Sequence, residues 1–176
     1  VEGGLDAAFF IVYVGQGALS AEGYAEAHAE AENKYEGIRL MLENHPDQVS
    51  LAVTADEVEQ IAATGRRVAL IGMENAFPLG PSIADIPMWA ERGVRYMSIT
   101  HFGNNQFGGS SNPDTEAGEP AEDPGLSDLG RELVASLNDH GIIVDVSHVG
   151  KQTMLDAIEL SRAPVMASHS GARAVY

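Results

Sequence analysis

The sequence predicts an α/β fold built on a parallel sheet, arranged either as a barrel or as a doubly wound sheet. Two observations carry this prediction. Short apolar runs rich in β-branched residues alternate along the chain with longer segments of helical periodicity. Several of the helical segments end at a glycine that returns the chain to the next apolar run, which is typical of strand–helix–strand units.

Compact apolar runs predict the strands. Residues 5–14 (LDAAFFIVYV) form a nearly continuous apolar run with aromatic and β-branched side chains, which favours a strand buried on both faces. Four shorter runs of the same kind follow. They cover residues 67–72, 94–100, 142–147 and 164–168.

Helical periodicity and capping signals predict the helices. Residues 20–44 carry apolar side chains at three- and four-residue spacing. Thr54 and Glu57 form a capping box that opens a second helix, which ends at Gly65. Further helices are expected over residues 82–89, 127–140 and 152–162.

One segment departs from this alternation. Residues 102–125 are rich in Gly, Asn, Pro, Ser and acidic side chains. A loop of this length is uncommon as a simple connection, so we expect it to be functional or mobile.

Length, charge and cysteine content limit the classes of function. The 176 residues suit one domain or part of a larger one. Lys and Arg number 10 against 26 Asp and Glu, a formal net charge of −16, which disfavours nucleic acid and anionic membrane surfaces as partners. No apolar run approaches the roughly 20 residues of a membrane helix. The absence of cysteine excludes disulfides and thiolate metal sites. No compartment signal is recognised, so localisation is left without a prediction.

Polar side chains follow four successive predicted strands. Glu74, His101, His148 and His169 each lie at or just beyond the carboxyl end of a run. Because the carboxyl ends of parallel strands meet on one face, we expect these side chains to form one site. Histidine and carboxylate without cysteine suit zinc or a similar divalent ion at a catalytic site. Glu74 is the carboxylate of this set and the candidate to bridge two metals.

Other polar residues keep open interpretations. Asp145, inside an apolar run, is either a partner of the histidine site or a buried, hydrogen-bonded acid. Ser147 and Ser168 lack the Gly-x-Ser-x-Gly elbow of a nucleophilic serine, which makes that role a weak alternative. The remaining histidines fall on predicted helices or their ends and are expected at the surface.

The chain resembles the renal (membrane) dipeptidase family. The resemblance rests on the order GGLDAAFFIVYV, IGMENA, GVRYMSITHFGNN, GLSDLGRELVASLNDHGIIVDVSHVGKQTM and SRAPVMASHSGARAV. The family consists of binuclear zinc peptidases with a (β/α)8 TIM-barrel-like fold. The resemblance implies that Glu74 bridges the two zincs, that His148 and His169 bind the second zinc, and that His101 contacts substrate and the tetrahedral intermediate.

The resemblance also implies that these residues are part of a larger catalytic unit. Residues 1–176 are expected to supply about five β/α units of a single barrel domain, with family residues before and after missing. The His-x-Asp pair and later Asp of the first zinc, and the Arg for the substrate carboxylate, find no match. Arg173 is too close to His169 to be assumed equivalent to that Arg. At most one zinc is therefore expected to be supported by this segment.

The function implied is hydrolysis of a dipeptide by a metal-bound hydroxide, with His101 stabilising the oxyanion. Two alternatives stay open. One is another barrel metallohydrolase acting on an amide, lactone or phosphoester, and the other is a metal- or ligand-binding relative without turnover. The expected partner is a small dipeptide substrate, with no nucleic acid and no membrane contact from this segment, and a homo-oligomer is allowed.

Overall fold

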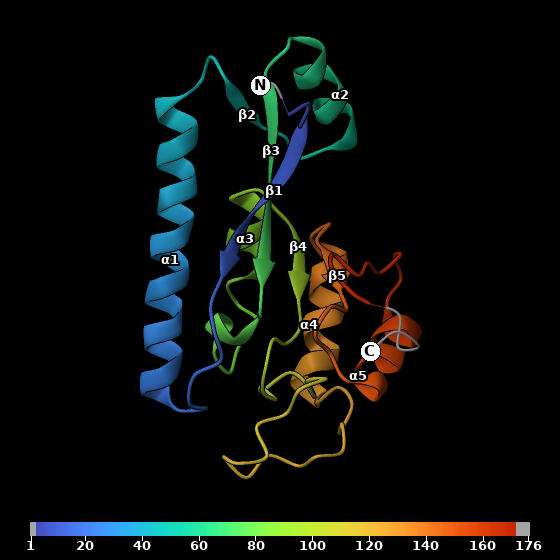
Figure 1. Cartoon of the computed structure of the whole chain (residues 1–176). Coiled ribbons are helices and arrows are strands. Elements are labelled where there is room, and N and C mark those ends of the chain that lie inside the picture. The colour runs from blue at the N-terminus through green and yellow to red at the C-terminus, as the bar shows by residue number, and fades with distance from the viewer. Residues whose placement is uncertain (1–2, 172–176) are drawn as a thin grey trace.

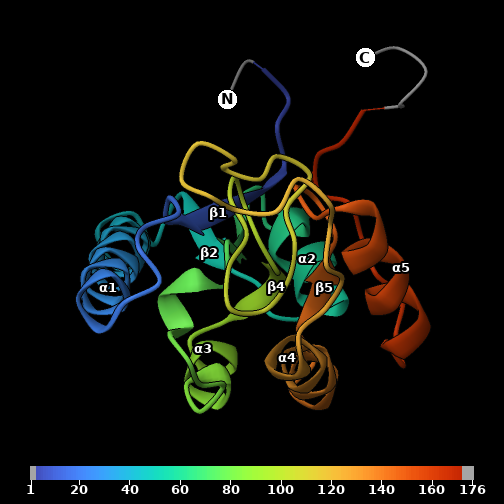
Figure 2. The same ribbon diagram turned by 90° about the horizontal axis from the view of Figure 1, so that it is seen from below.

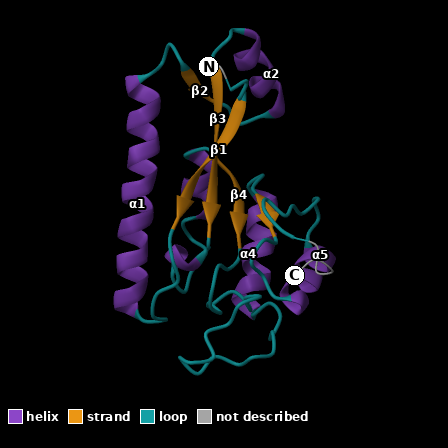
Figure 3. Cartoon of the chain, in the orientation of Figure 1, coloured by secondary structure: helices purple, strands orange, loops and turns teal. Residues whose placement is uncertain are grey.

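The computed structural model describes residues 3–171, so that Arg173 lies outside the described residues. A central parallel sheet is flanked by helices, and the strands point toward the end where the long loop lies (Figures 1 and 3). The strands are β1 (Ala7–Tyr13), β2 (Val49–Leu51), β3 (Arg67–Glu74), β4 (Val94–Ser98) and β5 (Ile143–Asp145). The helices are α1 (Ala21–Asn44), α2 (Ala55–Ala63), α3 (Ile86–Glu91), α4 (Asp128–Asp139) and α5 (Lys151–Leu160), with one 3-10 turn, η1 (Phe77–Leu79).

The sheet is open and entirely parallel in the described part of the chain. Its order is β1-β3-β4-β5, and β2 pairs with the first residues of β3. Seen from the end of the strands, α1, α3, α4 and α5 form an outer arc around the sheet (Figure 2). This arrangement confirms the predicted α/β class and the strand–helix–strand alternation.

The pairing register brings the carboxyl ends of four strands to one edge. Tyr13 of β1 pairs with Glu74 of β3, and Ser98 of β4 pairs with Asp145 of β5. The register between β3 and β4 shifts at Gly72, where a side-chain carbon would lie 2.3 Å from the Tyr96 ring. Any larger residue at this position would displace the Tyr96 ring.

The core lies between the sheet and the outer helices. α1 faces the sheet with small residues and Ile38, which lets this long helix lie close to its neighbours. α4 contributes a stripe of Leu133, Val134 and Leu137. Side chains of this size each contribute about 1.5–3 kcal/mol when removed from water. The largest fully buried side chains include Trp89, Phe77, Phe107, Ile71, Met73 and Met97.

Three elements differ from the sequence prediction. β2 was not predicted, because three residues are too few for a periodicity signal. The strand expected over residues 164–168 is a single parallel bridge between Met166 and Asp145, since Pro164 has no N–H to donate. The helix expected over residues 82–89 begins later, at Ile86, because the Ser82 hydroxyl accepts from Ala84 N–H and closes a local turn.

The long loop at residues 102–125 is anchored at both ends. Phe107 is fully buried, and the Ser127 N–H donates to its carbonyl. Near the other end, the Asp123 carboxylate accepts from the N–H and the hydroxyl of Thr153 in the first turn of α5, at 2.9 and 2.7 Å. A carboxylate in this place satisfies a free helix N–H and favours the positive end of the helix dipole.

None of the helices within residues 3–171 combines the length and the apolar character needed to cross a lipid bilayer.

Candidate metal centre

Glu74 and three histidines meet at the carboxyl edge of the sheet. Glu74 is the last residue of β3, and His101 and His148 follow the ends of β4 and β5. His169 follows Met166, which lies beside β5 through its bridge to Asp145. All four residues named from the sequence are thus brought together in space.

The distances define a compact cluster around one carboxylate oxygen. Oε1 of Glu74 lies 3.2 Å from Nε2 of His148, 3.5 Å from Nε2 of His169 and 3.6 Å from Nε2 of His101. The Nε2 atoms of His148 and His169 are 2.6 Å apart. Three imidazole nitrogens thus point at one acid, an arrangement that side-chain packing alone does not require.

The donor set fits a divalent metal ion. Ligand atoms of Glu74, His101 and His148 all lie within 4.8 Å of one another, and His169 contacts two of these residues. Imidazole with carboxylate is a typical ligand set of catalytic zinc. His101 and His169 approach Glu74 at similar distances, so the assignment of Glu74, His148 and His169 as ligands, with His101 facing substrate, stays a prediction.

Two residues of the centre have an unusual backbone. His148 and Asn75 are the non-glycine residues with positive φ in the described part of the chain, at 65° and 78°. Asparagine tolerates this left-handed region, whereas for histidine it costs free energy. Strained residues of this kind concentrate at functional sites, where the surrounding structure holds them.

Asn75 joins three strands directly behind Glu74. Its N–H donates to the Ser98 hydroxyl at 2.8 Å and its amide to the Val14 carbonyl at 3.1 Å. Its side-chain oxygen accepts from Asn105 at 3.1 Å. Asn75 was not among the site residues predicted from the sequence. The signal was a polar residue directly after Glu74, at a strand end where glycine or asparagine is expected if the chain turns sharply.

A second missed group joins the loops that carry two histidines. The Ser110 hydroxyl donates to the carbonyl of His101 at 2.5 Å, and Ser111 N–H donates to the carbonyl of His148 at 2.7 Å. Both serines belong to the long loop, so this loop orders the centre. No sequence pattern connects these positions, because the contact depends on how the loop folds back.

Burial lowers the pKa values of His101 and His148. The side chains of His101 and His148 are 14% and 17% exposed. Burial lowers the pKa of His101, and the positive charge of a protonated His148 lowers it further. Burial also lowers the pKa of His148, with His169 adding to the effect. Glu74 opposes both shifts. Neutral imidazoles are the form that binds metal.

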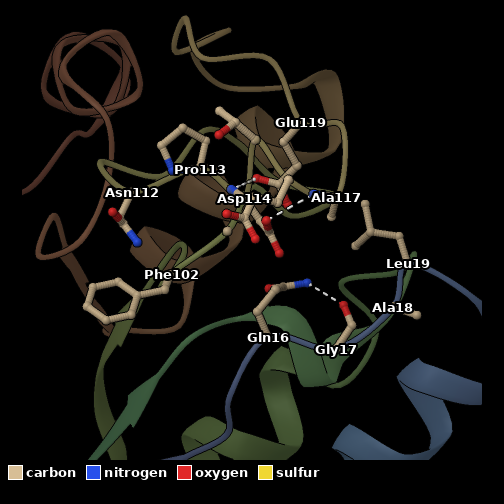
Figure 4. Close-up of a pocket in the computed structure, with 13 residues that line it drawn as sticks. Gln16, Gly17, Ala18, Leu19, Phe102, Asn112, Pro113, Asp114, Ala117 and Glu119 are labelled. Atoms are coloured by element: carbon tan, nitrogen blue, oxygen red, sulfur yellow. Dashed lines mark hydrogen bonds between the residues drawn. The ribbon is translucent and has the colours of Figure 1, made fainter.

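The long loop and the segment after β1 line a cavity of about 700 Å³ (Figure 4), which approaches the cluster through Phe102. Phe102 lines it, and the Phe102 ring is 4.5 Å from the ring of His101 and 5.3 Å from that of His148, measured between centroids. The opposite wall comes from the segment after β1, including Gln16 and Leu19. The volume is in the range of small-molecule sites.

The charged residues of the cavity lining are all acidic. Asp114, Glu116 and Glu119 belong to the long loop. The Glu119 carboxylate accepts from the N–H groups of Asn104 and Asp114, at 2.7 and 2.8 Å, and thereby holds the loop in its shape. The cavity therefore favours a cationic group over an anionic one.

A parallel α/β sheet with a histidine–carboxylate cluster at its carboxyl edge defines the class of barrel-type metallohydrolases. The family to which the chain belongs is narrower than this class. The family model described as membrane dipeptidase (Peptidase family M19) matches residues 1–176, and the chain belongs to this family.

Individual relatives agree with this assignment. The chain is 34% identical over 180 residues to the dipeptidase tcpJ of Claviceps purpurea, covering 99% of the chain and 41% of that protein. It is 34% identical over 166 residues to the dipeptidase ataJ of Aspergillus terreus, covering 86% of the chain and 40% of the relative. The chain thus spans less than half the length of these curated relatives.

Solved structures share the fold. The probable dipeptidase PvdM from Pseudomonas aeruginosa superposes with a TM-score of 0.89 at 33% identity, over 97% of this chain and 44% of that one. A metallo peptidase from Rhodobacter sphaeroides, liganded with a phosphinate mimic of the dipeptide L-Ala-D-Ala, superposes with a TM-score of 0.86 at 25% identity. That match covers 99% of this chain and 55% of the other. The fold class predicted from the sequence, a segment of a TIM-barrel-like metallohydrolase, is confirmed.

Proposed function

We propose that the protein containing this chain is a zinc-dependent dipeptidase that hydrolyses the peptide bond of dipeptides. The observation that carries the proposal is the convergence of three imidazole nitrogens on one oxygen of Glu74, in a chain that belongs to the membrane dipeptidase family. Residues 1–176 form part of a single catalytic barrel domain in this proposal.

Glu74, His148 and His169 would hold the metal. Their coordinating atoms face one another across 2.6–3.5 Å. A divalent ion held there would supply the Lewis acidity that peptide hydrolysis needs. Burial lowers the pKa of His148, which favours the neutral imidazole that metal binding requires.

His101 would donate a hydrogen bond to the oxyanion that develops on the peptide carbonyl. Its Nδ1 lies 3.5 Å from the Tyr13 hydroxyl, and the two rings meet edge to face at 4.9 Å between centroids. When the hydroxyl donates to Nδ1, the imidazole proton lies on Nε2, which faces Glu74 and the site. A neutral imidazole in this tautomer would be able to donate to the developing oxyanion.

The cavity beside Phe102 would receive the substrate. Its acidic lining suits the free ammonium end of a dipeptide. The dipeptide mimic bound to the Rhodobacter sphaeroides relative makes L-Ala-D-Ala a reasonable first substrate.

The proposed assembly is a homo-oligomer. The exposed apolar side chains of Leu5, Phe9 and Ile143 favour association between copies of the protein. Light scattering tests this assembly.

The test uses the intact protein that contains this chain. We expect hydrolysis of L-Ala-D-Ala or other dipeptides, bound zinc by elemental analysis, and loss of activity with a chelator that added zinc restores. Glu74→Gln should abolish hydrolysis, whereas His45→Gln, an exposed histidine at the end of α1, should leave it unchanged. Turnover of lactones or phosphoesters without dipeptide hydrolysis would overturn the proposal, as would zinc binding without any turnover.

A further inference from the structure

Asp145 is a buried acid, and both serines that hydrogen-bond to it, Ser147 and Ser168, also hydrogen-bond to His169. Its carboxylate, fully buried, accepts from the N–H and hydroxyl of Ser147 at 3.0 and 2.8 Å, and from the N–H and hydroxyl of Ser168 at 3.0 and 2.5 Å. None of the ion pairs within residues 3–171 involves Asp145. Burying a charge without a cation is costly, so four donors arranged around one acid call for a specific role.

The direction of each hydrogen bond follows from the donors available. A serine hydroxyl has one proton, and at 2.5 Å the Ser168 proton points to the Asp145 carboxylate, which can only accept. The Ser168 oxygen is then an acceptor toward Nδ1 of His169, 2.9 Å away. Nδ1 must therefore carry the imidazole proton, and Nε2 of His169 is left with its lone pair.

That lone pair faces the metal centre. Nε2 of His169 lies 2.6 Å from Nε2 of His148 and 3.5 Å from Oε1 of Glu74. Ser147 holds the main chain of the same residue, since the His169 N–H donates to its hydroxyl at 3.1 Å. His169 is otherwise half-exposed, so these contacts determine the orientation of its ring.

We propose that Asp145 and Ser168 are positioning residues that select the Nδ1–H tautomer of His169 and aim its Nε2 at the metal. The role rests on the metal site of the proposed function, but the tautomer is a property of the metal-free protein. A histidine ligand commonly donates its second N–H to an acid or carbonyl, which raises its basicity and fixes its ring. Here the Ser168 hydroxyl lies between the acid and the imidazole and hydrogen-bonds to both.

The substitution Asp145→Asn reverses the chain of hydrogen bonds without removing it. The remaining side-chain oxygen keeps the three donors on Oδ1, and the new amide group donates to the Ser168 oxygen in place of accepting from it. The Ser168 proton then turns to Nδ1 of His169. The ring must take the Nε2–H tautomer, which places a proton where the metal binds.

The experiment is nitrogen-15 NMR of the imidazole of His169 in the intact, metal-free protein at a pH where histidine is neutral, followed by zinc titration. We expect Nδ1–H in the unsubstituted protein and Nε2–H in the Asp145→Asn variant. Zinc affinity should fall by about 10- to 100-fold in this variant and in Ser168→Ala. Ser168→Thr, which keeps the hydroxyl, should restore both the tautomer and the affinity.

Ser147→Ala is the matched control. It removes the hydroxyl that holds the His169 main chain and leaves the bond between Ser168 and Nδ1 in place, so the tautomer should stay Nδ1–H. The same tautomer in the unsubstituted protein and in Asp145→Asn would overturn the inference. Failure of the unsubstituted protein to bind zinc counts against the proposed function instead, and the tautomer measurement separates the two results.

Discussion

At the residue scale, the surroundings of the three histidines differ, although their nitrogen atoms lie close together. His101 approaches Glu74 at 3.6 Å and has Tyr13 behind it, whereas His148 and His169 face each other at 2.6 Å. We therefore predict that His101→Ala lowers turnover by roughly 100-fold or more, as expected for loss of an oxyanion donor. Zinc content measured on the same sample should be unchanged. Loss of zinc from this variant would make His101 a ligand.

The backbone of His148 leads to a prediction on stability. At φ 65° the backbone of a residue with a β-carbon is strained, and asparagine tolerates this left-handed region better than histidine does. His148→Asn should raise the free energy of unfolding of the metal-free protein by about 1 kcal/mol while abolishing metal-dependent activity. Denaturant titration measures the first effect.

The control for this prediction is His45→Asn, at the end of α1, where φ is −130°. The same chemical change there relieves no left-handed strain, and we expect little change in stability. Equal effects at the two positions would mean that the gain at His148 comes from something other than its backbone.

The convergence of Glu74 and the three histidines could be predicted from their places at strand ends, because parallel topology brings such ends together. Their supporting groups could not. Asn75 bonds to Ser98 of β4, to Val14 after β1 and to the long loop, and Ser168 bonds to Asp145. These bonds depend on backbone turns and on a bridge of one residue, which leave no periodic pattern in the sequence. Asp145, ambiguous in the sequence, is explained only by its partners.

At the scale of elements, Gly130 of α4 allows the long loop to pack closely against this helix. A side-chain carbon at Gly130 would lie 1.9 Å from the Phe107 carbonyl oxygen, while one at Gly37 on the exposed side of α1 meets nothing within 4 Å. Gly130→Ala should therefore lower the free energy of unfolding by about 1–3 kcal/mol, because the loop must shift. Gly37→Ala should raise it by about 0.5–1 kcal/mol through the helix preference of alanine.

Chemical unfolding of the two variants measures both effects, and dipeptidase activity provides a second readout. The loop carries Ser110, which holds the carbonyl of His101, so Gly130→Ala should also reduce activity under conditions where the protein stays folded. Equal stability of the two alanine variants would contradict the close contact between the loop and α4.

The elements whose prediction succeeded are those with a strong local signal. The capping box of Thr54 and Glu57 forms as expected, and Ser20 caps α1. β2 and the segment at residues 164–168 were misjudged because pairing with a neighbouring strand, rather than local preference, decides whether such short runs become strands.

At the scale of the whole molecule, the described residues contain one cluster able to hold a metal ion at this edge of the sheet. We predict that a protein consisting of residues 1–176 binds at most one equivalent of zinc, because Glu74 is the only carboxylate within 4 Å of the three histidines among the ion pairs of the described residues. Calorimetric titration measures the stoichiometry. Two equivalents would mean that other residues of this chain serve as ligands.

The lowered pKa values of His101 and His148 couple the centre to the stability of the whole fold. Below about pH 6.5, the ordinary pKa of histidine, the unfolded chain takes up protons that the folded metal-free protein does not. The free energy of unfolding should therefore fall as the pH drops from about 7 through the lowered pKa values, by at most about 1.4 kcal/mol per pH unit for each histidine. Glu57 and Asp156, whose pKa values are lowered by hydrogen bonds, add a separate loss at more acidic pH. Denaturant titrations from pH 8 to about pH 5 measure this dependence. The free energy of unfolding should change less with pH in the double variant His101→Gln and His148→Asn, and the exposed histidines remain in both proteins. An equal change in both proteins would place the pH dependence outside the centre.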